Sequence, residues 1–328
     1  MLHLDNIFHQ NFLPQHISDG FFYQPRFLAN SSSFTLLDSG DGKKLEYLAG
    51  NKFVRPERQA LWQPADLTNW QDTTAEFNTS ADTIDKSDTL HKKNNDDIGK
   101  WHITKNLPEK WSIEHFGLSF HAKLTAFRHY GFFPEQSLLW QEMIEFCHKF
   151  KQHKLTALNL FAYSGMASLL LANQQLSVVH VDASKKAILY AEENITHDKG
   201  VKLLIDDAMG FIKREIRRQN RYHIILLDPP KFGRGPKGEV WDIWQHLPEL
   251  LSLLPNLLVD DQPAMVILTT YAIRSSCFAI GRALHQAMVG LNNKKNIHSV
   301  FGELCLTEQA RQFYIPQSVY TICHIEPK

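Results

Sequence analysis

Residues 156–175 read TALNLFAYSGMASLLLANQQ, which predicts a buried strand, a tight turn at 161–165 and a helix that follows at once. A strand that turns directly into a helix is the first half of a βαβ unit. Backbone N–H groups at such a helix N-terminus can hold a ligand closely. This stretch therefore predicts an α/β fold with a binding site at the turn.

The same alternation continues towards the C-terminus. Apolar runs of strand length are expected at Thr156–Phe161, Ser177–Asp182, Val201–Ile205, Tyr222–Asp228 and Ala264–Thr269. Helical stretches fill the gaps, so the strands should form a parallel sheet covered on both faces. Residues 297–306 and 318–325 predict two further strands with no helix between them. We expect a doubly wound, Rossmann-like, seven-stranded sheet that is mostly parallel and has an antiparallel last strand.

The first part of the chain follows a different pattern. Residues 1–67 contain short apolar runs separated by turn signals such as DSGDG at 38–42, where Gly and Asp tolerate a positive φ. Residues 71–99 are polar and lack periodicity, which predicts a flexible segment. A helix should start at Pro134-Glu135 and run to about His153. We therefore expect a small, mostly β domain over 1–115 and the α/β domain over 116–328.

The composition excludes several classes of protein. Lys and Arg number 35 and Asp and Glu also 35, and this balance argues against a strongly electrostatic nucleic-acid binder. The four cysteines form no CxxC pair, which suits a reduced cytosol. No signal peptide or membrane span is expected, so we predict a cytoplasmic protein. His148 and His153 would point in different directions on a helix, and no metal site is expected.

Acidic residues follow three of the predicted strands. Asp182 ends the second strand, Asp207 follows the third, and Asp228 ends the fourth and is followed by two prolines. Ligands of open α/β sheets bind at the carboxyl ends of the strands. A single acid there is more often a helix N-cap. Because each acid stands at a strand end in turn, we favour a ligand site over coincidence.

The order of these features resembles that of class I S-adenosylmethionine-dependent methyltransferases. Within that class, the stretches LNLFAYSG (158–165) and DPPKF (228–232) are similar to the branch of large-subunit ribosomal RNA methyltransferases, and their uncharacterised relatives, whose fourth motif reads DPPxF. Phe161 and Tyr163 stand where the general class has glycines, and only Gly165 remains. An aromatic-rich form of this motif is similar to that of the branch. The resemblance covers about residues 116–328.

The resemblance implies a role for each of these positions, with S-adenosylmethionine as the cofactor. Asp182 would hold the cofactor ribose, Ala183 beside it would also belong to the cofactor site, and Asp207 and Ala208 would meet the adenine. The methionine end would lie on Tyr163, Ser164 and Gly165. The segment 130–136 is similar to a motif of the branch that lies against the cofactor, which adds Gln136 and Thr125.

The same resemblance places the methyl acceptor beside the fourth motif. Asp228 and the backbone of Pro229 would face the acceptor. Phe232 would stack on an extruded base, or alternatively would anchor its loop in the core. The implied acceptor is a base of RNA, most specifically ribosomal RNA.

Cysteine usage bears on the atom that is methylated. Enzymes that form 5-methylcytosine attack the ring with a cysteine, whereas this chain has Lys231 after the prolines and Thr269-Thr270-Tyr271 after the fifth strand. Cys277 falls within the next predicted helix and is expected to fill the core. The pattern therefore favours nitrogen over carbon as the acceptor.

Basic residues support an RNA substrate to a limited extent. They occur in the loop KFGRGPKG, at Lys231, Arg234 and Lys237, and along the predicted helix over 208–218 and its exit. Both groups could contact phosphates, or could form a solvated face. A protein or small-molecule methyltransferase stays open as an alternative, as does a non-catalytic RNA-binding module. A nicotinamide-dependent oxidoreductase is disfavoured because the turn lacks G-x-G-x-x-G.

Overall fold

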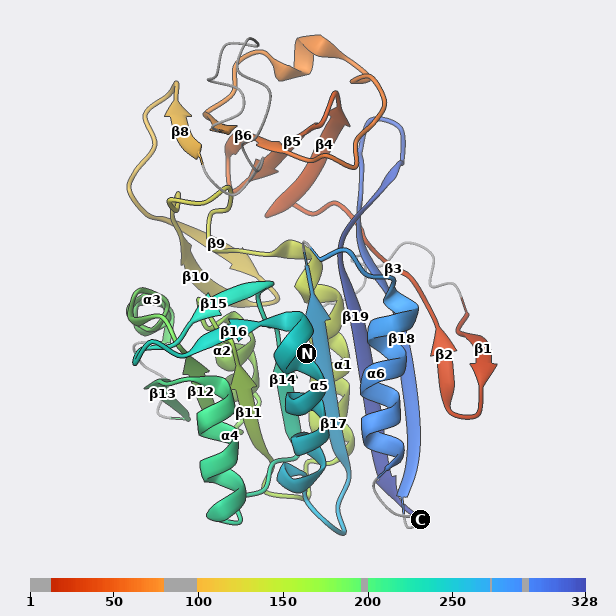
Figure 1. Ribbon diagram of the computed structural model, residues 1–328. Coiled ribbons are helices and arrows are strands. Elements are labelled where there is room, and N and C mark those ends of the chain that lie inside the picture. Colours follow the sequence, from red (N-terminus) through yellow and green to blue (C-terminus); the bar gives the residue numbers. More distant parts are fainter. Residues whose placement is uncertain (1–12, 80–98, 196–199, 272, 291–294) are drawn as a thin grey trace. The chain divides into compact units, whose positions relative to one another are not determined.

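The computed structural model describes residues 13–79, 99–195, 200–271, 273–290 and 295–328 (Figure 1). The chain forms two compact units. The β unit holds Phe27–Glu135 and Cys305–Pro316, and the α/β unit holds residues 13–26, Gln136–Leu304 and Gln317–Lys328. The β unit thus continues past the predicted boundary at residue 115 and includes a C-terminal segment.

One large sheet organises the α/β unit. In spatial order its strands are β1 (Gln15–Ser18), β2 (Phe21–Tyr23), β18 (Lys295–Thr307), β19 (Tyr314–Pro327), β17 (Ala264–Thr270), β14 (Ile224–Leu227), β11 (Thr156–Leu160), β12 (Ser177–Asp182) and β13 (Val201–Ile205), with β3 (Arg26–Leu28) paired to β18. Strands β11 to β14 and β17 are mutually parallel, and β19 is antiparallel to β17. The predicted α/β fold with an antiparallel last strand is confirmed.

Three N-terminal strands, β1, β2 and β3, enlarge this sheet beyond the predicted seven. β1 and β2 form an antiparallel hairpin, and β2 runs parallel to β18 from Phe21↔Ser299 to Tyr23↔Phe301. The sequence pattern placed both strands in the small β domain. They pair with β18 instead because the Phe21 ring stacks on Phe301 with their centroids 4.2 Å apart, and both rings are buried.

Helices cover both faces of the sheet, as expected for a doubly wound fold. α1 (Ser137–Lys149), α2 (Met166–Asn173) and α3 (Lys185–Ile195) lie on one face, and α4 (Ala208–Arg217), α5 (Ile243–Leu253) and α6 (Cys277–Val289) on the other (Figure 1). The 3-10 turns η2 (Pro134–Gln136) and η3 (Leu254–Leu257) precede α1 and follow α5. A helix follows Pro134 as predicted, but its first turn is the 3-10 turn η2 and it ends at Lys149, before the predicted end at about His153.

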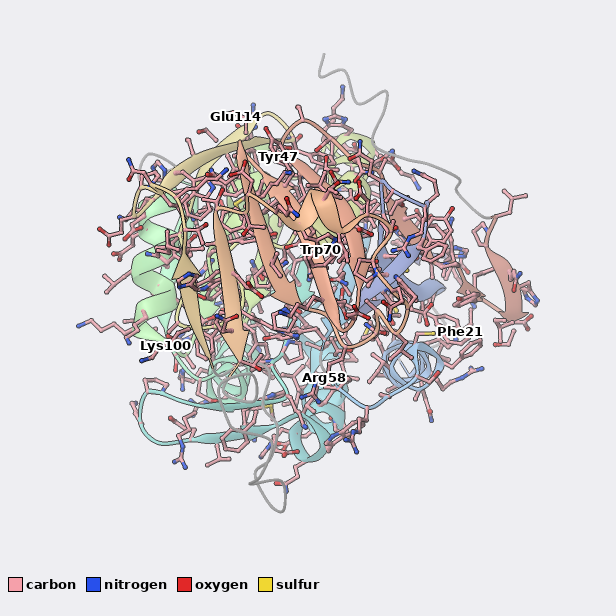
Figure 2. All side chains as sticks on the ribbon, turned by 90° about the horizontal axis from the view of Figure 1, so that it is seen from above. Phe21, Tyr47, Arg58, Trp70, Lys100 and Glu114 are labelled. Atoms are coloured by element: carbon pink, nitrogen blue, oxygen red, sulfur yellow. The ribbon has the colours of Figure 1, made fainter. Side chains whose placement is uncertain are left out.

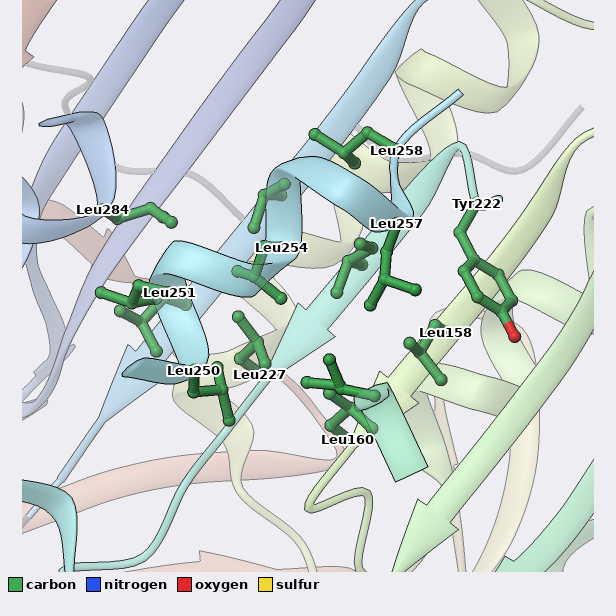
Figure 3. Packing of buried hydrophobic residues seen from close by; sticks show 14 of the residues in the cluster. Leu158, Leu160, Tyr222, Leu227, Leu250, Leu251, Leu254, Leu257, Leu258 and Leu284 are labelled. Carbon is green, nitrogen blue, oxygen red and sulfur yellow. The ribbon is translucent and has the colours of Figure 1, made fainter. Parts of the chain in front are cut away.

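A large core cluster of the α/β unit lies between the central strands and the α4–α6 layer. Leu158 and Leu227 from β11 and β14 pack in one buried cluster with Leu250 and Leu254 (Figure 3). All four residues of β14 are buried, which is why this strand reads as an unbroken apolar run. Burial of each such leucine side chain stabilises the folded state by about 1.5–3 kcal/mol. The packed core therefore holds the central strands, and the polar residues at their ends, in fixed positions.

A second sheet forms the β unit. Its strand order is β4 (Phe34–Gly40), β5 (Lys43–Leu48), β6 (Asn51–Pro56), β7 (Ala75–Thr79) and β8 (Gly99–Ile103), accompanied by the 3-10 turn η1 (Leu67–Trp70) and the hairpin β9 (Trp111–His115)–β10 (Leu118–Ala122). Figure 2 shows this sheet with Tyr47, Trp70 and Lys100 labelled. The turn predicted at 38–42 joins β4 to β5, with φ of 52° at Asp41 and 74° at Gly42.

The polar segment predicted at 71–99 is partly ordered. Ala75–Thr79 forms β7, which pairs with β6 and β8. Every second residue of β7, including Phe77, is buried, which is the alternation typical of a strand. The alternation covers only five residues within a polar segment, so it was not recognised in the sequence. Residues 80–98 lie outside the described residues.

A buried charge cluster fixes the segment that precedes α1. Glu46 is fully buried and accepts hydrogen bonds from Arg55 Nε at 2.6 Å and Tyr130 Oη at 2.9 Å, with Lys44 Nζ at 3.4 Å. Burial opposes ionisation, but the charges of Arg55 and Lys44 outweigh it and lower the pKa of Glu46 to about 2. Tyr130 is therefore anchored inside the β unit.

Candidate active site

The carboxyl ends of β11, β12, β13 and β14 meet at one edge of the large sheet, because these strands are parallel and in register. The turn at 161–165 follows β11, Asp182 ends β12, Asp207 follows β13, and Asp228 follows β14. The tertiary structure thus brings these predicted residues to the same edge.

The turn after β11 has an unusual backbone. φ is 56° at Phe161, 44° at Tyr163 and 86° at Gly165, which is the left-handed region that bulky residues rarely enter. A Cβ on Gly165 would be strained by the positive φ and would lie 2.5 Å from Ile195 Cδ1, so the Ile195 side chain would have to move. The aromatic residues thus adopt the conformation that glycines provide in the general motif, at a cost of about 1–3 kcal/mol each.

Aromatic contacts support this strained turn. The Phe161 ring packs against Trp241 with centroids 4.8 Å apart, and the Tyr163 ring meets Tyr190 edge-on at 5.9 Å. Asn194 Nδ2 donates to the Ser164 carbonyl at 3.0 Å. These contacts offset the backbone strain and hold the turn in one shape.

Asp182 is a partly buried carboxylate at the end of β12. Its Oδ2 accepts from the backbone N–H of Tyr163 at 3.0 Å, and its Oδ1 accepts from that of Ser184 at 2.8 Å, with half-buried Ala183 between β12 and Ser184. Burial raises its pKa, while the bonds from Ser184 and Tyr163 act in the opposite direction. No cation pairs with it within the described residues. A carboxylate has about four lone-pair sites, so two remain, which fits the two hydroxyl donors of a ribose.

Asp207 caps helix α4. Its Oδ2 accepts from the backbone N–H of Gly210 at 2.7 Å, and the buried Ala208 begins the helix. Its neighbour Asp206 pairs with Arg214. Asp207 therefore acts as a helix N-cap, which was the alternative to a ligand-binding role. Its Oδ1 is available to accept from a donor group. Its predicted contact with the adenine of the cofactor stays a prediction.

Asp228 is held by two neighbouring side chains. Thr269 Oγ1 donates to its Oδ1 at 2.6 Å, and Gln136 Nε2 donates to its Oδ2 at 3.5 Å. Gln136 Nε2 also donates to Thr269 Oγ1 at 3.3 Å. Gln136 was predicted to line the cofactor site, and in the structure its side chain contacts Asp228 and Thr269. Pro229 is buried and cannot donate a backbone hydrogen bond.

A β hairpin leaves the sheet directly after the two prolines. It consists of β15 (Phe232–Arg234) and β16 (Val240–Asp242). The Phe232 side chain is 55% exposed, which rules out the core-anchor alternative. The anchor is Trp241 instead, which is buried and donates its Nε1 proton to the Pro230 carbonyl at 2.7 Å. Phe232 is thus free to contact a partner.

Thr125 belongs to the β unit. Its hydroxyl donates to the His129 carbonyl at 2.8 Å, so it stabilises a local turn. Its predicted role in cofactor binding stays a prediction.

Sequence reasoning missed four residues of this region, namely Thr269, Tyr190, Asn194 and Trp241. Thr269 could have been found, because it too lies at the carboxyl end of a predicted strand. The others carry no local signal, because their roles depend on contacts with residues distant in the chain.

The described residues contain no group of three or more His, Cys, Asp or Glu side chains that could hold a metal ion. Among the described helices, none is long and apolar enough to span a membrane.

The strand order and the strand-end residues define a class I S-adenosylmethionine-dependent methyltransferase. The chain is 34% identical to the SAM-dependent methyltransferase from Agrobacterium tumefaciens, with 99% of this chain and 100% of that chain covered and a TM-score of 0.81. The chain belongs to the S-adenosylmethionine-dependent methyltransferases, and S-adenosylmethionine is its cofactor. A protein from Streptococcus mutans described as a SAM-dependent methyltransferase is 15% identical and shares the fold with a TM-score of 0.63 over 89% of this chain and 76% of that chain.

Shorter stretches match two curated proteins. An uncharacterised RNA methyltransferase of Protochlamydia amoebophila is 28% identical over 39% of this chain and 30% of its own length. A protein of Methanocaldococcus jannaschii named as a ribosomal RNA large subunit methyltransferase is 32% identical over 31% of this chain and 26% of its own. The matches thus span less than a third of these relatives. No family model matches the chain.

Proposed function

We propose that this enzyme methylates a nitrogen of a base in RNA, most specifically ribosomal RNA, in the cytoplasm. The observation that carries the proposal is the hairpin that follows Asp228. It presents the exposed side chains of Phe232 and Val240 together with exposed Arg234 at the end of β14. An aromatic ring beside cations is the combination that stacks a base and binds its phosphates.

The pairing of cations distinguishes this hairpin from the other basic segment. Along α4 and its exit, Lys213 pairs with Glu249, Arg214 with Asp206, and the C-cap residue Arg218 with Glu215, whereas Arg217 and Arg221 make no ion pair with a described acidic side chain. Within the described residues, the hairpin cations Lys231, Arg234 and Lys237 make no ion pair with an acidic side chain. Basic groups without acidic partners are available for phosphate, so we assign RNA contact to the hairpin, all of whose cations lack such partners, and a solvated face to the paired cations of α4 and its exit.

The names of the two curated relatives support the acceptor class. One is named an RNA methyltransferase and the other a ribosomal RNA large subunit methyltransferase. The resemblance of DPPKF to the DPPxF motif points to the same substrates.

The cysteines support nitrogen as the acceptor atom. All four are buried, and Cys277 lies at the start of α6, where burial raises its pKa to about 12. The thiolate is the nucleophilic form, so this cysteine is a poor nucleophile at neutral pH. Attack on a pyrimidine carbon would need such a group, whereas a nitrogen attacks with its own lone pair.

The residues of the site then act by positioning. When bound, the cofactor supplies an activated methyl group, which the acceptor nitrogen takes as the bond to sulfur breaks. Asp228 accepts an N–H of the acceptor and so aims the lone pair, and the proton that nitrogen sheds passes to Asp228 or to water. Phe232 holds the base, and the rigid DPP backbone fixes the distance. Such orientation supplies a large part of the barrier reduction in displacement reactions.

Transfer of a radioactive methyl group tests the proposal. Ribosomal RNA from a strain lacking the gene should accept label, while RNA from the wild-type strain should not. Asp228→Ala should slow turnover by about 10²- to 10⁴-fold. Its affinity for S-adenosylmethionine should change by only a few fold. If label enters protein or small molecules and never RNA, the RNA assignment fails and the alternative acceptors apply.

A further inference from the structure

We propose that Asn159, Ser168 and His180 are positioning residues for the cofactor, because their side chains join the two ends of the turn at 161–165 and tie both ends to β12. This inference rests on the assignment of the methionine end of S-adenosylmethionine to that turn. It is independent of whether RNA is the methyl acceptor.

The three residues meet because of the sheet register and the position of α2. Asn159 of β11 lies opposite His180 of β12 in the parallel register. The neighbours of Asn159, Leu158 and Leu160, belong to the core cluster on the α4–α6 side. Successive residues of a strand point to opposite faces, so Asn159 and His180 point to the face covered by α1, α2 and α3. Ser168, in the first turn of α2, reaches both of them from that face.

The hydrogen bonds run in one direction through the three side chains. Asn159 Nδ2 donates to Ser168 Oγ at 3.0 Å, and Ser168 Oγ lies 3.0 Å from His180 Nδ1. The hydroxyl has one proton, and within the described residues its oxygen makes these two hydrogen bonds, so the proton is directed at His180 Nδ1. Burial lowers the pKa of His180 to about 4, so the ring is neutral at pH 7 and carries its proton on Nε2.

All three polar side chains lie in the interior. Asn159 is 5% exposed, and Ser168 and His180 are fully buried. A buried polar group costs free energy unless it is hydrogen-bonded, whereas an apolar side chain would fill each position without that requirement. Ser168 Oγ can reach both partners only when α2 keeps one depth and one rotation on the sheet. The polar chain therefore fixes one arrangement of β11, α2 and β12.

This chain of bonds closes the turn at its base. Asn159 stands before the turn and Ser168 after it, so their bond joins the strand that enters the turn to the helix that leaves it. His180 lies on the same strand as Asp182, whose Oδ2 accepts from the backbone N–H of Tyr163 at 3.0 Å. The turn is thus held at its base by Ser168 and within the turn by Asp182.

Backbone strain makes this anchoring important for binding. Phe161 and Tyr163 have φ of 56° and 44°, and such conformations persist only where the surroundings hold them. Without the bonds of Ser168 the turn gains access to relaxed conformations, and the apparent affinity falls with the fraction of molecules that keep the competent one. Ser168→Ala should therefore weaken S-adenosylmethionine binding by about 5- to 30-fold, as expected for the loss of two buried hydrogen bonds.

A second buried serine provides a matched control. Ser299 of β18 is fully buried, and its Oγ lies 2.8 Å from His285 Nδ1 and 3.0 Å from Cys323 Sγ. In the sheet, β18 is separated from β11 by β19, β17 and β14. Ser299→Ala should lower thermal stability about as much as Ser168→Ala, but should keep the affinity within about twofold of wild type, because the site is distant from the turn. If calorimetry finds the same affinity in both variants, the proposal is overturned.

Substitutions at His180 separate positioning from packing. His180→Leu fills the site with an apolar side chain but removes the acceptor, so the affinity should fall as in Ser168→Ala. His180→Asn leaves a cavity and lowers stability, but its Oδ1 can accept from Ser168 in place of Nδ1, so the affinity should stay within about threefold of wild type. The two variants should therefore rank in opposite orders for affinity and for thermal stability. If His180→Asn binds the cofactor as weakly as His180→Leu, the proposal is overturned.

Two measurements without cofactor test the anchor separately from the site. Nitrogen-15 NMR should show the His180 proton on Nε2, and a proton on Nδ1 would contradict the direction of the bonds. Backbone hydrogen exchange at 161–165 should be faster in Ser168→Ala than in Ser299→Ala. Equal exchange would overturn the role of Ser168 as an anchor, whereas faster exchange with unchanged affinity would overturn the assignment of the cofactor to the turn. None of these measurements involves a methyl acceptor, so failure of the RNA assignment would leave their results unaffected.

Discussion

The backbone N–H of Tyr163 donates to Asp182 Oδ2 at 3.0 Å and so ties the turn after β11 to the acid at the end of β12. Tyr163 can do this because its φ of 44° turns the peptide towards the neighbouring strand. The unusual backbone of the turn and the orientation of the acid are therefore two parts of one structure.

Asp182→Ala should weaken S-adenosylmethionine binding by about tenfold to a hundredfold, because hydrogen bonds to a charged group contribute ~1.5–3 kcal/mol. Isothermal titration calorimetry measures the affinity directly. The exposed acid Asp261 provides the control, since Asp261→Ala should bind as wild type does. An unchanged affinity in Asp182→Ala would mean that this acid serves only the turn.

The affinity should also depend on pH through Asp182. Burial raises its pKa, so on acidification it becomes protonated at a higher pH than an ordinary aspartate. The neutral acid accepts hydroxyl hydrogen bonds less strongly, and affinity should therefore fall on acidification, beginning at a higher pH than for an ordinary aspartate. In Asp182→Asn this dependence should be lost. A pH profile that is the same in both proteins would assign the titration to another group.

Gly165→Ala should destabilise the protein by about 1–3 kcal/mol, because the residue has a positive φ and the new Cβ would clash with Ile195. Cofactor binding should weaken in parallel. Thermal unfolding and calorimetry measure the two effects. Gly290→Ala is the control, since its added Cβ would have no contact under 3.5 Å. Equal behaviour of the two variants would show that the turn tolerates a side chain.

Cys277→Ser should cost about 1–3 kcal/mol of stability, because it places a hydroxyl where a buried thiol packs. Methyl transfer by the folded variant should be nearly unchanged. Complete loss of transfer in a folded Cys277→Ser protein would instead indicate a covalent mechanism and overturn the preference for nitrogen.

Replacing Arg234 and Lys237 with alanine should flatten the salt dependence of RNA binding, because each lost phosphate contact lowers the slope of log affinity against log salt by about 0.7–0.9. The matched control replaces Lys213 and Arg218, which are already paired with acids on and beside α4. Binding measured at several salt concentrations distinguishes the pairs. If replacing Lys213 and Arg218 lowers the salt dependence more than replacing Arg234 and Lys237, the RNA contact would be assigned to α4 and not to the hairpin.

Phe232→Ala should raise the KM for the acceptor by about 5- to 100-fold, as expected when base stacking worth about 1–3 kcal/mol is lost. The cofactor affinity should stay the same, because Phe232 is exposed. The exposed Phe278 on α6 supplies a comparison, and Phe278→Ala should change neither quantity. A matching loss of cofactor affinity in Phe232→Ala would place this ring at the cofactor.

Much of the α/β unit could be predicted from the sequence alone. The bounds of β12 and β13 agree with the prediction residue for residue, and β11 and β17 agree within one residue. Their apolar runs are set by local periodicity, which burial on both faces of the sheet imposes. The same periodicity marks where each strand ends, and so it identified Asp182, Asp207 and Asp228.

Only the tertiary structure decided which residues meet. Gln136 and Thr269 lie 133 positions apart and touch because β17 joins β14 and α1 begins beside them. The β1–β2 hairpin extends the large sheet because the Phe21 ring stacks on the Phe301 ring of β18. Strand pairing over such separations depends on side-chain packing and not on local period. The sequence by itself therefore determined the order of the elements and the acids at their ends, and the fold decided which side chains hold those acids in place.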